Sequence, residues 1–374
     1  MTEVLLEELS DSDINWMVAN GRQQELAPGS VLIEQQRDVD ALYIVLDGTL
    51  VATIARNQGG VMGRVFAALE DDQDLEQEIA RFSSGEVLGE LSFLGLSASS
   101  TTVKATERSV VLAVPRQRLL DKFEEDLGFA SRFYRAIAIL LLGRFERLIK
   151  LYLRRKSAQQ IPPLQDIPVI FGELNDSDVD WMVEHSQING VAAGTVLIRA
   201  GRPVENLYVL LEGTLSVSVS ETRRSALTRA FLLLENNAPT ETEESLGREI
   251  ARSSRGEIIG ETALLDSRLS TSTVTALENS MLLVVPRQQL LIKLQQSLGM
   301  STRFYRVIAM LLAGRLQGLI SRLGYGRDTY SGINQALSSD VQYEDEIDLE
   351  VMDNITLGGA RFDWMLRRLK VRGA

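Results

Sequence analysis

The chain has 374 residues, a formal net charge of −12 at pH 7, one histidine and no cysteine. This length fits two or three domains, each with its own core. The missing cysteines exclude disulfides, thiolate metal sites and thiol nucleophiles, and the single His185 excludes a histidine-rich metal site. Because an acidic chain is repelled by phosphate backbones, we expect no specific DNA binding.

Residues 1–13 (MTEVLLEELSDSD) contain neither the basic region nor the apolar region of a signal peptide. The longest apolar stretches, such as 136–142, are far shorter than the roughly 20 residues that span a bilayer. We therefore expect a soluble, cytoplasmic protein without a transmembrane segment.

The sequence contains a long internal repeat. Residues 9–18 (LSDSDINWMV) recur as 174–183 (LNDSDVDWMV), and residues 85–90 (GEVLGE) recur as 256–261 (GEIIGE). A repeat of this length is too long for a solenoid unit and indicates a duplicated domain. Residues 157–168 contain three prolines and little periodicity, which is typical of a linker.

Within each repeat, the elements can be predicted in chain order. Ser10 with Asp13, and Asn175 with Asp178, are spaced as the N-cap and N3 residues of a capping box, so each should begin a short helix. Short β-rich segments separated by single glycines follow and predict a barrel or roll. In the first repeat these segments are residues 31–33, 41–46, 49–54 and 110–114. Helical periodicity then covers residues 116–127, 131–155, 287–298 and 301–323.

The predicted fold class is mainly β with α: two jelly-roll-like β-rolls, each with flanking helices and a long C-terminal helix. The predicted domains are residues 1–156 and 169–325, joined by the linker 157–168 and followed by an extension, 326–374. That extension contains an acidic stretch at 344–350 and a basic amphipathic segment at 361–372. The first repeat also contains an inserted segment at 56–77 and the second one at 221–246. Both insertions are predicted to hold a helix, at 61–69 and 226–234, which either packs on its own roll or docks on a partner.

The order of these motifs, from PGSVLI through LYIVLDGTL and SGEVLGELSFL to VLAVPRQRLL, resembles the cyclic nucleotide-binding domain. The resemblance covers nearly all of both repeats. It implies a phosphate-binding cassette in which a Gly-Glu-Leu run, a short helix and a loop with an arginine hold a cyclic nucleotide. Cyclic AMP or cyclic GMP is then the candidate ligand. In overall likeness, the nearest subgroup is a set of cyanobacterial tandem-domain proteins associated with bacteriocin-type transport operons.

In the family, the cassette glutamate accepts a hydrogen bond from the ribose, and backbone N–H groups with the arginine hold the phosphate. The matching positions here are Gly89, Glu90, Leu91 and Ser92 in the first repeat and Gly260, Glu261, Thr262 and Ala263 in the second. The loop positions are Ser99, Ser100 and Thr101, and Ser270, Thr271 and Ser272.

The two loops depart from the family pattern, because the arginine position is Ser99 in one repeat and Ser270 in the other. Losing a buried Arg–phosphate pair costs on the order of 2–5 kcal/mol. Arg268 lies two residues upstream of Ser270 and is a candidate replacement, whereas the first repeat offers none nearby. The loops either bind an anionic ligand without the arginine, or they are only turn structures in domains that bind proteins.

The helices 132–155 and 303–323 are apolar on nearly every face at their centres, so they should be buried against each other within the chain or between chains. The basic cluster that begins at Arg144 is interpreted as a solvated helix end. In the extension, Phe362, Trp364, Met365 and Leu369 form one candidate apolar face, expected to dock on the chain itself, on a partner or on an anionic surface.

No P-loop, nucleophile elbow or HExxH motif occurs, and 326–374 is too short and too acidic for a helix-turn-helix domain. We therefore expect a non-enzymatic regulatory or adaptor protein that senses a nucleotide or anionic ligand and has a protein partner or forms homo-oligomers. The alternative is a structural or assembly component that uses ligand-free β-rolls as interaction modules.

Overall fold

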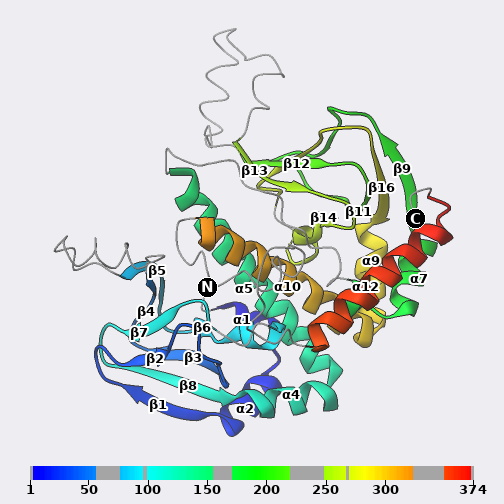
Figure 1. Ribbon diagram of the computed structural model, residues 1–374. Coiled ribbons are helices and arrows are strands. Elements are labelled where there is room, and N and C mark those ends of the chain that lie inside the picture. Colours follow the sequence, from blue (N-terminus) through cyan, green and yellow to red (C-terminus); the bar gives the residue numbers. More distant parts are fainter. Residues whose placement is uncertain are drawn as a thin grey trace, which may run out of the picture. The chain divides into compact units, whose positions relative to one another are not determined.

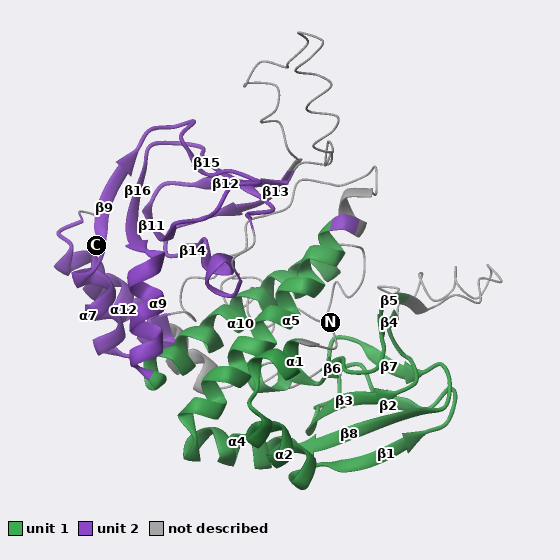
Figure 2. Ribbon diagram, turned by 180° about the vertical axis from the view of Figure 1, so that it is seen from behind, with its two compact units in different colours: residues 1–149, 298–352 green, residues 150–297, 353–374 purple. Residues whose placement is uncertain are grey.

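The computed structural model describes residues 3–55, 76–95, 99–154, 171–219, 248–266, 269–322 and 349–371 (Figure 1). The predicted helices at 61–69 and 226–234, the linker 157–168 and Arg268 lie outside these residues. The chain forms two compact units, residues 1–149 with 298–352 and residues 150–297 with 353–374 (Figure 2). The first unit therefore contains a helix from the second repeat.

The first unit contains a β-roll of two four-stranded antiparallel sheets, with strand orders β1-β8-β3-β6 and β2-β7-β4-β5 (Figure 1). The strands of the first sheet are β1 (Arg22–Leu26), β8 (Ser109–Pro115), β3 (Ala41–Asp47) and β6 (Val87–Leu88). Those of the second are β2 (Val31–Ile33), β7 (Thr102–Ala105), β4 (Leu50–Ala55) and β5 (Glu76–Phe82). All four strand segments predicted for this repeat are present.

The second unit repeats this topology, with strand orders β14-β11-β16-β9 and β10-β15-β12-β13. The strands of its first sheet are β14 (Ile258–Ile259), β11 (Asn206–Glu212), β16 (Ser280–Pro286) and β9 (Gln187–Val191). Those of its second are β10 (Val196–Ile198), β15 (Thr273–Ala276), β12 (Leu215–Val219) and β13 (Arg248–Ser253). The predicted pair of β-rolls with flanking helices is thus confirmed.

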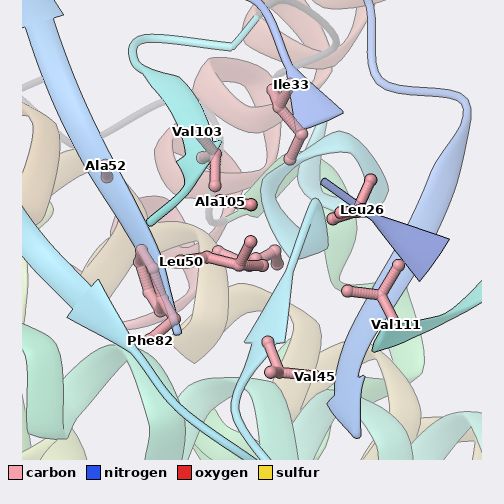
Figure 3. Close-up of a cluster of buried hydrophobic side chains, with 10 residues drawn as sticks. Leu26, Ile33, Val45, Leu50, Ala52, Phe82, Val103, Ala105 and Val111 are labelled. Carbon is pink, nitrogen blue, oxygen red and sulfur yellow. The ribbon is translucent and has the colours of Figure 1, made fainter. Parts of the chain in front are cut away.

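Apolar side chains from both sheets fill the inside of each roll. In the first unit, Leu50 of β4 is fully buried and lies among side chains from the seven other strands of the roll, most of which are labelled in Figure 3. Val45 and Val111 are also fully buried, and Phe82 closes the cluster beside β4. These alternating inward positions are what a strand with one buried face requires.

The helix that precedes each roll begins at the predicted capping box. Ser10 caps α2 (Asp11–Asn20), and Asn175 caps α7 (Asp176–Glu184), with the N3 aspartate bonding back to the cap N–H in both helices. In the first unit, the N3 residue Asp13 is also held by Arg132, whose Nε and Nη2 donate to its carboxylate at 2.7 and 3.0 Å.

After β8 the chain forms α4 (Arg116–Glu125) and α5 (Leu127–Arg154), and after β16 it forms α9 (Arg287–Gln296) and α10 (Leu298–Arg322). Phe123 of α4 and Phe133 of α5 lie against Phe93, at ring-centroid distances of 6.1 and 5.7 Å. Phe93 belongs to the 3-10 helix η1 (Glu90–Leu94), which holds the first predicted cassette. The aromatic cluster therefore fixes this short helix to α4 and α5.

The C-terminal helix α12 (Leu349–Arg368) packs within the second unit. Phe362, Met365 and Leu366 are buried, and the Phe362 ring lies 5.3 Å from that of Phe171. This helix docks on the chain itself, one of the three alternatives left open by the sequence. Trp364, expected on the apolar face, is instead 38% exposed, because the buried face contains Leu366 in its place.

Candidate functional site

Both predicted cassettes begin at a glycine in the left-handed backbone region. Gly89 (φ 81°) precedes η1, and Gly260 (φ 89°) precedes η2 (Glu261–Leu264). A Cβ at residue 89 would lie 2.5 Å from the Ala41 carbonyl oxygen, and one at residue 260 would lie 2.7 Å from that of Asn206. Only glycine fits, since the backbone conformation and the close approach both exclude a side chain.

The short helices η1 and η2 are held by equivalent arginines from outside the cassette. Arg116 donates from Nε to the Ser92 carbonyl oxygen at 3.1 Å, and Arg287 donates to that of Ala263 at 2.8 Å. In the first unit Ser92 also donates from its hydroxyl to the Gly89 carbonyl oxygen at 2.7 Å. These contacts give Ser92 and Ala263 a structural role within the cassette.

The hydroxyl groups that replace the family arginine point back into their own loops. Ser99 Oγ donates to the Thr101 carbonyl oxygen at 2.8 Å and accepts from the Thr101 N–H at 3.3 Å. Ser270 makes the same two contacts with Ser272, at 2.8 and 3.3 Å. This is the turn chemistry that serine supplies to a loop. Ser100 is buried, whereas the equivalent Thr271 is exposed.

Each loop is clamped by backbone hydrogen bonds to the segment that joins β2 to β3, or β10 to β11. Ser99 N–H donates to the Arg37 carbonyl oxygen and its own carbonyl accepts from Gln36 N–H, at 2.9 and 2.7 Å. Ser270 makes the equivalent pair with Arg202 and Gly201, at 2.9 and 2.8 Å. Since Gly89 and Gly260 also contact this connecting segment, the two halves of each predicted cassette meet on it.

In the first unit the cassette glutamate forms a buried ion pair. The Glu90 carboxylate accepts from the Arg144 guanidinium of α5, and their side chains are 4% and 12% exposed. Arg144 also donates to the Val87 carbonyl oxygen, and its guanidinium carbon lies 5.1 Å from the centre of the Phe82 ring. The Glu90 carboxylate, predicted from the sequence to accept from a ribose hydroxyl, is therefore paired with a cation of the chain itself.

A second pair lies one helical turn further along α5. Arg147 lies 3.7 Å from the Glu86 carboxylate, and Glu86 accepts from the Ser83 N–H at 2.8 Å. Burial lowers the pKa of Arg147, although the nearby Glu86 acts in the opposite direction. Two successive turns of α5 thus place guanidinium groups on the two glutamates that flank β6.

Arg144 is the residue that the sequence interpretation missed, because it was assigned to a solvated helix end. The signal was present: residues 137, 141, 144 and 148 share one helical face, and the other three are buried and apolar. An arginine inside such a stripe requires a buried partner. In the second repeat, Arg315 occupies the aligned position.

In the second unit, Glu261 is 3% exposed, as deeply buried as Glu90. Thr262 is partly buried beside it, as Leu91 is in the first unit. His185, which follows α7, is exposed, and its ring is stacked on Trp181 with a centroid distance of 4.5 Å.

Two further properties bear on the kind of site. Within the described ranges, no three histidine, cysteine, aspartate or glutamate side chains are arranged to hold a metal ion. In the same part of the chain, none of the helices combines the length and apolarity needed to span a bilayer.

Each unit thus combines a β-roll with a glycine–glutamate turn that begins a short helix. The sequence of the cyclic nucleotide-binding domain family matches residues 23–126 and 189–297, together more than half of the chain. The chain belongs to this family, with two such domains in tandem.

Solved structures provide further similarities. One is described as cAMP-bound PfPKA-R (141-441), with 14% identity over 87% of this chain and 90% of that chain and a TM-score of 0.29. Another is the regulatory domain of Toxoplasma gondii PKA with cAMP, with 17% identity over 79% and 89% and a TM-score of 0.27.

A third is the N-terminal domain of a transcriptional regulator from Streptomyces coelicolor A3(2), with 22% identity over 42% and 93% and a TM-score of 0.29. No curated protein matches the chain. The family assignment rests on the sequence match.

Proposed function

We propose that this chain is a non-enzymatic regulatory protein that senses a nucleotide or related anionic ligand through its tandem domains. The observation that carries the proposal is the buried Glu90–Arg144 pair at the first cassette. In this proposal the Glu90 carboxylate accepts from a hydroxyl group of the ligand, and the adjacent Arg144 guanidinium binds its anionic group. Arg144 thereby supplies from α5 the cation that Ser99 cannot supply from the loop.

Such a site links ligand binding to the long helices. A ligand that takes over the Glu90 carboxylate or the Arg144 guanidinium must alter their mutual contact. Because α5 continues from Arg144 back to Ser131, which is hydrogen-bonded to α10 at Ser301, a change at the cassette would bias how the two helices pack. A protein partner or a second copy of the chain would then recognise the altered packing of the two helices.

The loop geometry favours a second candidate function, that of an assembly component with ligand-free β-rolls. Ser99 and Ser270 use their hydroxyls within their own loops, and Glu90 is satisfied without any ligand. A domain of this kind would have partners for these polar groups without any bound ligand. The likeness to cyanobacterial transport-associated proteins fits either function and remains a prediction, as does the cytoplasmic location.

Calorimetry of the full chain with cyclic AMP and cyclic GMP distinguishes the two functions. We expect weak binding by the unaltered chain, and tighter binding by Ser99→Arg and Ser270→Arg, by about thirtyfold or more for a gain of roughly 2 kcal/mol. Glu261→Ala should abolish binding at the second cassette. Binding by none of these proteins would establish the ligand-free alternative.

The role of Arg144 needs its own comparison, with Arg147→Gln as the matched control on the same helix. If Arg144 holds the anionic group of the ligand, Arg144→Gln weakens binding and Arg147→Gln leaves it nearly unchanged. If Arg144→Gln instead tightens binding, Arg144 only competes for Glu90 and the proposed cation role is wrong.

A further inference from the structure

The second unit contains a pocket of about 240 Å³ between β10, β11 and the segment that joins them. Its polar lining comes from Arg199, Arg202, Glu205, Asn206 and Tyr208. None of the cassette residues that the structure describes lines it, although Ser270 of the second cassette is hydrogen-bonded to this segment at Gly201 and Arg202. The pocket therefore adjoins the second cassette but is formed by other side chains.

The two arginines of this pocket are available to a ligand. Both are exposed, and neither side chain makes a hydrogen bond or ion pair with the residues that the structure describes. They are three residues apart in the sequence and line one small pocket, so their like charges repel each other. An anion bound between them would remove that repulsion and accept hydrogen bonds from both guanidinium groups.

In the first unit, the equivalent segment between β2 and β3 contains an ion pair of its own. Glu34 occupies the position of Arg199, and Arg37 lies 3.2 Å from its carboxylate. Residues 34–40 carry one arginine and three carboxylates, whereas residues 199–205 carry two arginines and one carboxylate. The change from the carboxylate of Glu34 to the guanidinium of Arg199 therefore removes the ion-pair partner of the other arginine and adds a second positive charge.

Backbone hydrogen bonds hold the segment between β10 and β11 in place. Gly201 N–H and the Arg202 carbonyl oxygen are both bonded to Ser270, and Arg287 N–H donates to the Glu205 carbonyl oxygen at 2.9 Å. The two guanidinium groups thus extend from a backbone that is held at both ends. A held backbone reduces the entropy that must be lost when the side chains close on a ligand.

We propose that this pocket binds a small phosphorylated molecule, with its phosphate dianion held between Arg199 and Arg202. Phosphate matches the planar donor geometry of guanidinium groups. The pocket is smaller than the roughly 300–1,000 Å³ of sites for drug-sized ligands, which fits a phosphate with a small organic group. Asn206 and Tyr208 provide polar groups for that remainder.

The experiment is a titration of the full chain with inorganic phosphate at constant ionic strength, chloride being the replaced anion, followed by ³¹P NMR and thermal unfolding. We expect phosphate to broaden its resonance and raise the melting temperature in a saturable manner. Arg199→Glu, which restores the residue of the first repeat, and Arg202→Gln should each weaken binding by about tenfold or more. Arg252→Gln, an exposed arginine of the same unit paired with Glu249, is the matched control.

A parallel titration with a 5′-mononucleotide tests whether the pocket contacts the organic group of the ligand as well as its phosphate. Tighter binding than phosphate shows that the organic group is also held, and equal binding shows that the phosphate alone is held. Absence of binding at about 10 mM phosphate, or equal binding by the unaltered chain and both arginine variants, would overturn the proposal. The cassettes are tested with cyclic nucleotides and with other variants, so the two proposals fail separately.

Discussion

Ser131 Oγ lies 2.7 Å from Ser301 Oγ, and both side chains are buried. The Arg135 guanidinium lies 5.9 Å from the centre of the Tyr305 ring, one turn further along both helices. These two contacts show that α5 and α10 run parallel to each other in the first unit. One chain thus contains both helices of a pair that the sequence left open between one chain and two.

This pairing predicts the effect of a charge at the helix centres. Leu141 of α5 is fully buried and Leu311 of α10 is 4% exposed. Leu141→Asp or Leu311→Asp should cause aggregation or loss of folding, because an unpaired buried charge costs several kcal/mol. Leu127→Asp and Leu298→Asp, at exposed positions of the same helices, are the controls for thermal unfolding. Soluble central variants with unchanged melting temperatures would contradict the packing.

A second prediction concerns the pH dependence of the first unit. Burial by itself raises the pKa of Asp13, but the hydrogen bonds from Arg132 and Ser10 outweigh it, and the pKa lies below 3.8. The ionised carboxylate therefore contributes stability above about pH 4, and this contribution is lost as the pH falls through the lowered pKa.

The test is urea unfolding of Asp13→Asn at pH 7 and near pH 3. At pH 7 we expect a decrease of about 1–2 kcal/mol in the free energy of unfolding, and near pH 3 a smaller difference from the unaltered chain. Asp11→Asn, an exposed position in the same helical turn, should change stability by less than about 0.5 kcal/mol. A difference that does not depend on pH would show that the charge of Asp13 is not what stabilises the helix.

The capping boxes could be predicted from sequence because both partners lie within four residues. The same holds for the glycine turns and the strands of the first roll, which local patterns specify. The Glu90–Arg144 pair could not be found in this way, since 54 residues separate the two and only helix packing brings them together. The Arg199 pocket was missed for a different reason. The two repeats were compared for the motifs that they share, whereas the change of charge from Glu34 to Arg199 is a difference between them.

The C-terminal helix provides a third prediction. Arg361 donates to the carbonyl oxygens of Phe171, Gly172 and Leu174 and to the Asp176 carboxylate. Arg361→Leu should therefore lower the stability of the second unit by on the order of 2–3 kcal/mol and increase hydrogen exchange in α12. Arg367→Gln, an exposed arginine on the same helix, should change neither. Unchanged exchange in Arg361→Leu would show that these contacts do not hold the helix.

A fourth prediction concerns nucleic acid. With a net charge of −12, the chain should not bind duplex DNA specifically at about 150 mM salt, where specific proteins typically reach roughly 10⁻⁸ M or tighter. A gel shift with sequence-specific binding below micromolar concentration would contradict this.

The last prediction separates the stability of the Glu90–Arg144 pair from its role in binding. Glu90→Gln leaves the Arg144 guanidinium buried without its carboxylate, which should cost about 3–5 kcal/mol. The double variant Glu90→Leu with Arg144→Met replaces the pair by apolar groups and should recover most of that loss, because neither charge then has to be desolvated. Chemical denaturation of the unaltered chain, the single variant and the double variant measures both the loss of stability and its recovery. Glu78→Gln, which breaks the exposed pair with Arg81 at 2.6 Å, should cost less than about 1 kcal/mol. If Glu90→Gln costs no more than this control, the Glu90–Arg144 pair is solvated and does not stabilise the packing of α5 on the cassette.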